Sequence, residues 1–394
     1  MYIVGIDIAK RNHEAVVMDG QGSVVRRSFS FANSTAGLEK FLDVLSRISQ
    51  DPSDFTIGME STSHYWFALF SALKRRGYRI QVLNPIQSNA MRGLYIRQVK
   101  NDQRDSFIIA DVIRFGRYTQ GQTPSDDLYA LRELCRARVF LVSMAADTKK
   151  KVIALLDQVF PEYETIFSKI FCLTSTDLLL ECATPEEILA IDTNKLVEIL
   201  ETASRKRYRL PKALQIKEIA QNSFGISLAA DTFSLLIKQH VEHVRFIEGQ
   251  IANIDAKIAE LFSRFDTCIT TIPGIGPVLG ATIFSEIGDI SRFSSSAKLA
   301  AFAGIDPTVN QSGEFTGTHN HMSKRGSPYL RRALWQAAVV AVQYNPALKA
   351  FHKKKLAEGK PHMNAIGHVT RKLTNIIFAV LRDNQPYVLR MAPE

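Results

Sequence analysis

The chain has 394 residues, of which 46% are hydrophobic and 22% are charged, and its formal net charge is +10. This hydrophobic content is enough for two or three packed domains and excludes an intrinsically disordered chain. The sequence has no apolar run of about eighteen residues and no secretory leader, so we expect no membrane partner and a cytoplasmic location. Its four cysteines show no CxxC spacing, which argues against a zinc site or a disulfide framework.

Positive charge is concentrated in two windows of the sequence. Residues 74–104 contain eight Lys or Arg and one acid, and residues 315–382 contain twelve Lys or Arg and one acid. A single basic run is usually a solvated surface, but two such windows favour a polyanionic partner, and we predict nucleic acid. The expected backbone contacts are Lys74, Arg75, Arg76, Arg92, Arg97, Lys100 and Arg104 in the first window, and Lys324, Arg325, Arg331 and Arg332 in the second.

Residues 1–120 are predicted to form an α/β domain. Three meandering strands followed by alternating strands and helices indicate a mixed sheet with helices on both faces. The predicted strands are 2–8, 13–18, 24–31, 55–60 and 78–83, and the predicted helices are 35–48, 65–76 and further helical turns up to residue 118.

Four acids stand where these predicted elements end or begin. Asp7 ends the first strand, Glu60 ends the fourth, and Asp102 and Asp105 share one face at the start of a helix. One such acid alone is more often a turn or ion-pair residue. Four converging carboxylates repel by about 4 kcal/mol per close pair at an effective dielectric of about 20, so they need a cation between them. Oxygen ligands alone favour Mg²⁺ or Mn²⁺, and we predict such a site, with the first basic window beside it.

This order of strands and acids resembles the RNase H-like fold of RuvC-type resolvases and many transposases. In that fold, two metal ions clamp the attacking and leaving oxygens of a phosphodiester. The resemblance implies a RuvC-like metal-binding domain at residues 1–120.

Residues 121–264 are predicted to form a helical middle region. Apolar residues from Leu128 to Leu155 follow helical spacing along a first long helix that ends near Pro161. A helical insert of undefined purpose follows at residues 167–225.

A second long helix carries a heptad pattern. Four aliphatic residues from Ile237 to Ile258 are seven apart, and His240 is the one polar residue on their seam. The pattern favours a coiled coil between protomers, and hence a homodimer or homotetramer, with His240 fixing the register. A core helix in a single-chain bundle is the alternative.

Residues 265–394 are predicted to form a mostly α-helical third domain. It opens with two glycines, Gly274 and Gly276, ahead of apolar residues at helical spacing. No predicted strand precedes them, which argues against a dinucleotide-binding turn. The pattern resembles a helix-hairpin-helix, in which backbone N–H groups at the turn bind DNA phosphate.

The next motifs carry a more specific resemblance. Together with the four acids, they resemble the insertion-sequence 110 / Piv family of DEDD transposases, also called bridge-RNA-guided recombinases, over nearly the whole chain. The insert departs from the compact members by making this chain longer. The motifs are Ala301-Phe302-Ala303-Gly304, Asn310-Gln311-Ser312-Gly313 and Ser323-Lys324-Arg325-Gly326-Ser327-Pro328.

This resemblance implies roles for residues and partners. Asp7, Glu60, Asp102 and Asp105 would be the metal-binding tetrad, and Ser312 would be the nucleophile that forms a phosphoserine link to DNA. Since no base lies near Ser312 in the sequence, the acids must reach it from another domain, and in the family from another protomer. The implied partners are donor DNA, target DNA and a noncoding bridge RNA in the nucleoid of a prokaryotic cell.

Two other classes of function stay open at this point. A RuvC-like metal-dependent DNA endonuclease or junction resolvase would use water as its nucleophile and would not need Ser312. A non-catalytic nucleic-acid-binding scaffold would need Asp7 for affinity at most.

Overall fold

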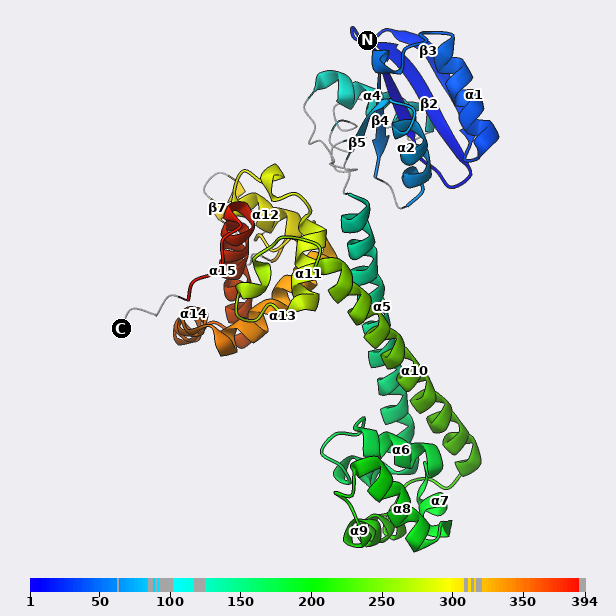
Figure 1. The fold of residues 1–394 in the computed structure, drawn as a ribbon, viewed down its shortest axis with the longest axis vertical. Coiled ribbons are helices and arrows are strands. Elements are labelled where there is room, and N and C mark those ends of the chain that lie inside the picture. The colour runs from blue at the N-terminus through cyan, green and yellow to red at the C-terminus, as the bar shows by residue number, and fades with distance from the viewer. Residues whose placement is uncertain are drawn as a thin grey trace. The chain divides into compact units, whose positions relative to one another are not determined.

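The computed structural model describes residues 1–61, 64–83, 88, 91, 102–116, 125–307, 311–312, 315–316 and 321–389, without the side chains of 102, 103, 311, 312, 315 and 316. Figure 1 shows the two compact units into which the chain divides, Met1–Thr123 and Pro124–Glu394. The three-domain division at residues 120 and 264 stays a prediction. None of the described helices is long and apolar enough to cross a membrane.

The N-terminal unit is built on one mixed sheet with the strand order β3-β2-β1-β4-β5. β1, β2 and β3 form an antiparallel meander, whereas β4 and β5 run parallel to β1. The predicted mixed sheet is confirmed, and no strand boundary differs from its prediction by more than one residue. The elements are β1 (Tyr2–Asp7), β2 (Asn12–Asp19), β3 (Val24–Ala32), α1 (Thr35–Ser46), η1 (Pro52–Asp54), β4 (Phe55–Glu60), α2 (Trp66–Lys74), β5 (Arg79–Leu83) and α4 (Asp102–Phe115).

The two faces of this sheet pack against different helices. Val4 of β1 shares a buried cluster with Phe41 of α1 and Leu73 of α2. Ile3, the preceding residue, points to the other face and clusters with Ile109 of α4. Figure 1 shows α1 and α4 on opposite sides of the strands.

The C-terminal unit is mainly helical. Its elements are α5 (Asp126–Val159), η2 (Pro161–Thr165), α6 (Leu173–Glu181), α7 (Pro185–Ala190), α8 (Thr193–Ser204), α9 (Leu210–Gln221), α10 (Ala230–Phe262), η3 (Ile269–Thr271), α11 (Pro277–Ile287), η4 (Ile290–Arg292), α12 (Ser296–Ala303), β6 (Gln311–Ser312), β7 (Phe315–Thr316), α13 (Pro328–Tyr344), α14 (Pro346–Ala357) and α15 (His362–Asp383).

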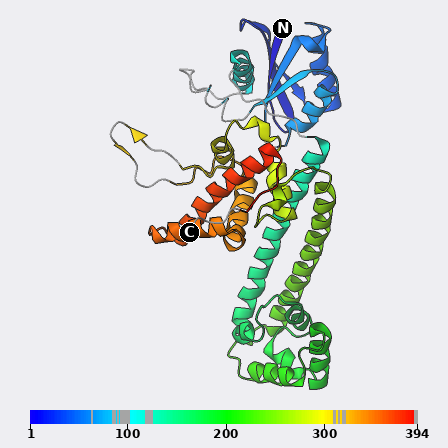
Figure 2. The ribbon, with the colours of Figure 1, turned by 60° about the vertical axis from the view of Figure 1, so that its left-hand side comes forward.

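Two long helices, α5 and α10, lie side by side in both ribbon views (Figures 1 and 2). Arg138 of α5 pairs with Asp255 of α10, and Lys149 pairs with Glu248, so the two helices are antiparallel. Helices α6 to α9, which form the insert, share a buried cluster with the far end of this hairpin. The predicted first long helix, ending near Pro161, is confirmed.

The heptad residues of α10 are used within the chain. Ile237, Val244 and Ile258 are buried, and Val241 rather than His240 is the buried residue between the first two. These buried residues have ordinary helical spacing, and α10 packs within its own chain. This agrees with the alternative interpretation, a core helix in a single-chain bundle. The coiled coil between protomers stays a prediction.

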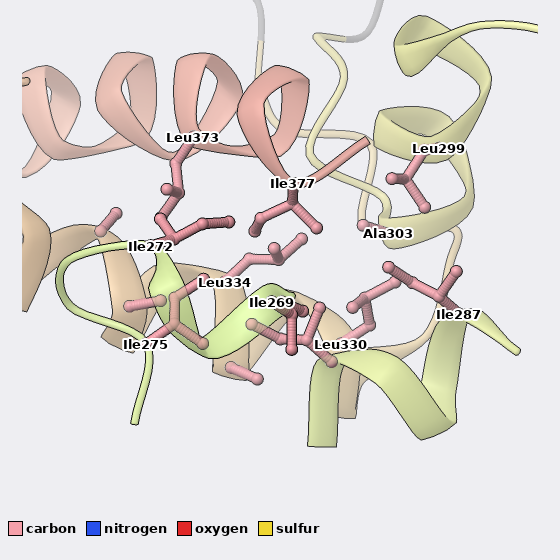
Figure 3. Close-up of a cluster of buried hydrophobic side chains, with 14 of the residues drawn as sticks. Ile269, Ile272, Ile275, Ile287, Leu299, Ala303, Leu330, Leu334, Leu373 and Ile377 are labelled. Carbon is pink, nitrogen blue, oxygen red and sulfur yellow. The ribbon is translucent and has the colours of Figure 1, made fainter. Parts of the chain in front are cut away.

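Helices α11 to α15 surround one hydrophobic core, part of which Figure 3 shows. Ile269 and Ile272, from the segment before α11, lie there with Leu334 of α13 and Ile377 of α15. The predicted helix-hairpin-helix covers this segment. Where that motif has a first α-helix, the chain has the three-residue 3-10 helix η3, so the motif stays a prediction.

Candidate active site

Two of the predicted acids end neighbouring parallel strands. Asp7 is the last residue of β1, and Glu60 is the last residue of β4. The strands pair in parallel, with Ile6 opposite Met59 as the last matched pair before the acids. Both carboxyl groups therefore lie at the same edge of the sheet.

Helix α4 covers the sheet face to which both acids belong. Because side chains alternate along a strand, Asp7 shares its face with Gly5, and Glu60 shares its face with Gly58. A Cβ atom on Gly5 would lie 2.0 Å from the carbonyl oxygen of Ser106 in α4. Glycine at this position is what allows α4 to lie directly on β1.

Because of the direction in which α4 runs, its first turn lies at the same edge of the sheet as Asp7 and Glu60. Arg114, near the end of α4, lies within 3.2 Å of the position that a Cβ on Gly22 would take. Gly22 lies in the β2–β3 turn, beside the start of β1, because Tyr2 pairs with Asp19. Helix α4 therefore runs opposite to β1, and Asp105, 8% exposed in its first turn, lies toward the end of that strand.

The four predicted acids offer only oxygen ligands, which suit Mg²⁺ or Mn²⁺. Asp102 opens α4 one turn before Asp105, but its side chain is outside the described residues. Among the side chains that are described, no group of three His, Cys, Asp or Glu is placed to hold a metal ion. The fold thus brings the acid-bearing ends of β1, β4 and α4 to one edge without showing a metal centre.

Ser312 belongs to the other compact unit and lies on a short hairpin. Strands β6 and β7 pair antiparallel, with Ser312 opposite Phe315. A β-bridge joins Pro307, before β6, to Met322, after β7. This bridge closes the hairpin at its base, which we call the foot of the hairpin. The side chain of Ser312 lies outside the described residues, and the structure shows only the position of its backbone.

Close backbone packing holds the foot of this hairpin. The amide of Lys324 donates to the carbonyl oxygen of Gly304 at 3.0 Å, and the hydroxyl of Ser323 donates to the carboxylate of Asp306. Lys324 has a φ of +53°, a left-handed conformation that is uncommon for lysine and concentrates at functional sites. The motif segments around residues 304 and 324 therefore meet at one turn.

Two family models match the chain on either side of its helical insert. Residues 4–161 match a model for DEDD transposases of the IS110 type, and residues 266–353 match the model described as the transposase IS116/IS110/IS902 family. The chain belongs to the IS110/IS116/IS902 family of transposases. It is therefore an enzyme of a transposase and site-specific recombinase family, and such enzymes act on DNA.

Relatives of this transposase match it over nearly their full length. A protein of insertion element IS116 from Streptomyces clavuligerus is 24% identical over 97% of this chain and 95% of its own length. The mini-circle putative transposase for IS117 from Streptomyces coelicolor is 25% identical, with 97% and 94% covered. The pilin gene-inverting protein of Moraxella bovis is 23% identical, with 98% of each chain covered. Among solved structures, Thermus thermophilus RuvC matches 30% of this chain and 98% of its own, at 16% identity and a TM-score of 0.22.

Three basic residues of this transposase lie away from the acids that they were expected to flank. Lys74, Arg75 and Arg76 come at the end of α2, which returns the chain from the end of β4 to the start of β5. They therefore lie at the opposite edge of the sheet, and the expected position beside the acids is wrong for them. Arg104 does lie in the first turn of α4. The remaining predicted contacts of this window, Arg92, Arg97 and Lys100, lie outside the described residues.

The two glycines before α11 differ in what surrounds them. Gly274 has a φ of +97°, and a Cβ there would lie 2.6 Å from the amide nitrogen of Ala341 in α13. Gly276 caps the start of α11, and a Cβ there would meet nothing within 4 Å. Packing alone thus explains Gly274, while phosphate binding at either glycine stays a prediction.

The four predicted contacts of the second basic window come just after the foot of the Ser312 hairpin, in the turn before α13 and in its first turn and a half. Arg331 donates to the carbonyl oxygen of Ala303 at 3.2 Å. Arg332 donates to the hydroxyl of Ser143 in α5, also at 3.2 Å. Lys324 and Arg325 are exposed in the turn just before α13.

Sequence reasoning missed a buried carboxylate that joins three helices of this unit. Glu286 of α11 accepts bonds from Arg136 of α5, at 2.6 and 3.1 Å, and from the hydroxyl of Ser327, the N-cap of α13, at 2.8 Å. Burial alone would lower the pKa of the Arg136 guanidinium, but its bonds to Glu286 raise it above the ordinary value. The sequence signal that could have indicated this buried pair is the single acid among the mainly apolar residues of α11.

Proposed function

We propose that this chain is the transposase of an insertion sequence, which cuts and rejoins DNA through a covalent phosphoserine intermediate on Ser312. The observation that carries the proposal is the convergence of the ends of β1 and β4 with the first turn of α4. The strand ends that carry Asp7 and Glu60 and the first turn of α4 lie at one edge of the N-terminal sheet, and Ser312 belongs to the other compact unit; in this proposal they are the two parts of the active site.

In this proposal, the hydroxyl oxygen of Ser312 attacks the scissile phosphate. A serine–phosphate bond forms, the bond from phosphorus to the leaving DNA oxygen breaks, and that oxygen takes up a proton. Because the new link is again a phosphodiester, the step can be reversed onto a different DNA end. Bound Mg²⁺ or Mn²⁺ would supply stabilisation of the developing negative charge. Asp7, Glu60, Asp102 and Asp105 would hold the ions.

The partners of the reaction also belong to the proposal. A homodimer or homotetramer would complete the site by bringing the acids of one protomer to Ser312 of another. Donor and target DNA would be selected by base pairing with a bridge RNA, so the protein needs mainly phosphate and shape contacts. The basic windows, together with the turn at Gly274 and Gly276, would supply those contacts.

The test is the capture of the covalent intermediate. The protein is incubated with end-labelled DNA, bridge RNA and Mg²⁺, and a denaturation-resistant protein–DNA adduct is sought by gel electrophoresis. We expect the adduct with the wild-type chain and its loss in Ser312→Ala. Ser294→Ala, which removes an exposed hydroxyl from the same unit, is the matched control and should retain it.

Other outcomes would identify the alternatives. An adduct that persists in Ser312→Ala contradicts the assignment of the nucleophile. Strand cleavage without any adduct, unchanged in Ser312→Ala, would favour an endonuclease that uses water. If Asp7→Ala changed affinity for DNA and nothing else, the acids would have no catalytic role.

A further inference from the structure

A cavity of about 750 Å³ lies at the foot of the Ser312 hairpin. Met322, which forms the β-bridge that closes the hairpin, is one of its lining residues. The others come from the residue just before Met322, from the turn after it and from the first two and a half turns of α13. They are His321, Lys324, Pro328, Arg331, Arg332, Trp335 and Gln336.

The charge of this cavity suits a phosphate group. The described lining contains Lys324, Arg331 and Arg332 and no acid. A guanidinium has five N–H donors, and the bonds from Arg331 to Ala303 and from Arg332 to Ser143 each occupy one nitrogen. Pro328, the first residue of α13, also lines the cavity, so the positive end of the α13 dipole adds to its positive charge.

An aromatic residue, Trp335, is among the residues that line the same cavity. Trp335 is half-buried, and its ring lies 3.8 Å from the position that a Cβ on Gly367 of α15 would take. One side of the indole is thus supported by the core, while the residue also lines the cavity. A phosphate needs cations and no aromatic platform, so the pairing of the two indicates a ligand with both a phosphate and a flat base.

We propose that this cavity binds one unpaired nucleotide of a single-stranded segment. Its phosphate contacts Lys324, Arg331 and Arg332, and its base stacks on Trp335. A base inside a duplex is stacked on both faces, so only an unpaired one can present a face to the indole. The inference rests on the proposed function for its place beside Ser312, but its test measures binding and needs no chemistry.

The chain contains two tryptophans, Trp66 and Trp335, which makes Trp335 a direct reporter. In full-length Trp66→Phe, all indole fluorescence comes from Trp335. This protein is titrated with single-stranded DNA, single-stranded RNA and duplex DNA, each of about ten nucleotides per strand. We expect saturable quenching by single strands and none by the duplex. Whichever of DNA or RNA binds more tightly identifies the source of the nucleotide.

Substitutions then separate stacking from charge. Trp335→Leu keeps apolar packing against α15 but removes the ring, and we expect about tenfold weaker binding of a labelled single strand, measured by anisotropy. Tyr344→Leu is the matched control because Tyr344 is 66% exposed at the end of the same helix, outside the cavity lining. Arg332→Gln should reduce the slope of log affinity against log salt by about one unit.

Quenching of Trp335 by the duplex as strong as by single strands would show that the cavity binds backbone phosphate alone. Unchanged affinity in Trp335→Leu would remove the stacking role. Ser312→Ala should bind single strands as the wild type does, so failure of the covalent chemistry and failure of this site are distinguishable.

Discussion

Two glycines decide how closely α4 approaches the sheet and hence where its acids lie. A Cβ on Gly5 would lie 2.0 Å from the Ser106 carbonyl oxygen and 2.5 Å from the Ala110 amide nitrogen, both backbone atoms of α4. On Gly58, a Cβ would lie 2.7 Å from Cγ1 of Ile113. A side chain at Gly5 cannot be accommodated by rotating a neighbour, since the obstacle is the helix itself.

Gly5→Ala should lower the free energy of unfolding of the N-terminal unit by about 1–3 kcal/mol, the usual cost of overpacking, measured by urea unfolding. Because α4 must shift, the variant should also lose adduct formation at temperatures where it is still folded. Gly20→Ala is the control, since a Cβ there meets nothing within 4 Å. Equal stability of the two variants would show that α4 does not lie against β1.

The residues that carry the site differ in how far the sequence could locate them. Asp7 and Glu60 could be placed because a strand end is a local pattern. The sequence could not show at which edge of the sheet Lys74 lies, because that depends on the direction in which α2 crosses the sheet. The pairing of Glu286 with Arg136 spans 150 positions, and no local periodicity indicates a partner at that distance.

At the scale of elements, Glu286 connects α5, α11 and the start of α13. Its carboxylate is almost fully buried, and Arg136 reaches solvent only in part. Removing the acid leaves the partly buried Arg136 without this partner and Ser327 without its acceptor.

The second prediction concerns this junction. Glu286→Ala should lower the free energy of unfolding of the C-terminal unit by about 3 kcal/mol, the low end for breaking a buried ion pair, because the arginine can still reach water. Denaturant unfolding measures it. Glu133→Ala removes the exposed partner of the same arginine, 3.8 Å away, and should change stability by well under 1 kcal/mol. A larger effect at Glu133 would contradict the assignment.

A second carboxylate, Glu187 of α7, binds side chains of α10. It accepts bonds from Lys238 at 2.8 Å, from Ser234 at 2.7 Å and from the amide of Ala183 at 2.6 Å. Burial alone would raise the pKa of this carboxyl, but the bonds from Lys238, Ser234 and Ala183 outweigh it and hold the pKa below its ordinary value.

The third prediction is a pH dependence with a defined sign. A carboxyl whose pKa is depressed by folding adds stability above its unfolded pKa, and that stability is lost as the pH falls through the folded value. The melting temperature of Glu187→Gln should therefore lie below that of the wild type at pH 7, and the difference should shrink below about pH 4.5. Glu186→Gln, which changes the exposed neighbouring acid, should track the wild type throughout. A difference that grows on acidification would reverse the assigned sign.

The elements themselves were largely predictable, and their partners were not. Strand alternation and Pro161 are local signals, and the structure confirms the strands and the helix end that they predict. The heptads of α10 predict an apolar face but not which helix covers it. In the structure, α5 of the same chain packs against α10. Two helices of one chain meet without the loss of translational and rotational freedom that two separate chains would incur.

At the scale of the whole molecule, the acids and the serine belong to different compact units. A site assembled from two protomers would take its acids from one chain and Ser312 from the other. Only a site shared between protomers would let two chains, each inactive alone, regain activity when they are mixed.

Co-expressed Asp7→Ala and Ser312→Ala chains should regain adduct formation. In a mixed dimer, one site combines both substitutions and is inactive, while the other combines wild-type acids with a wild-type serine. Random pairing then gives about one quarter of the wild-type adduct in a twofold assembly. A size tag on the Asp7→Ala chain identifies it as the one that carries the DNA, because it alone has Ser312. If the mixture stays inactive while two differently tagged wild-type chains co-purify and react, each site must draw its acids and its serine from one chain.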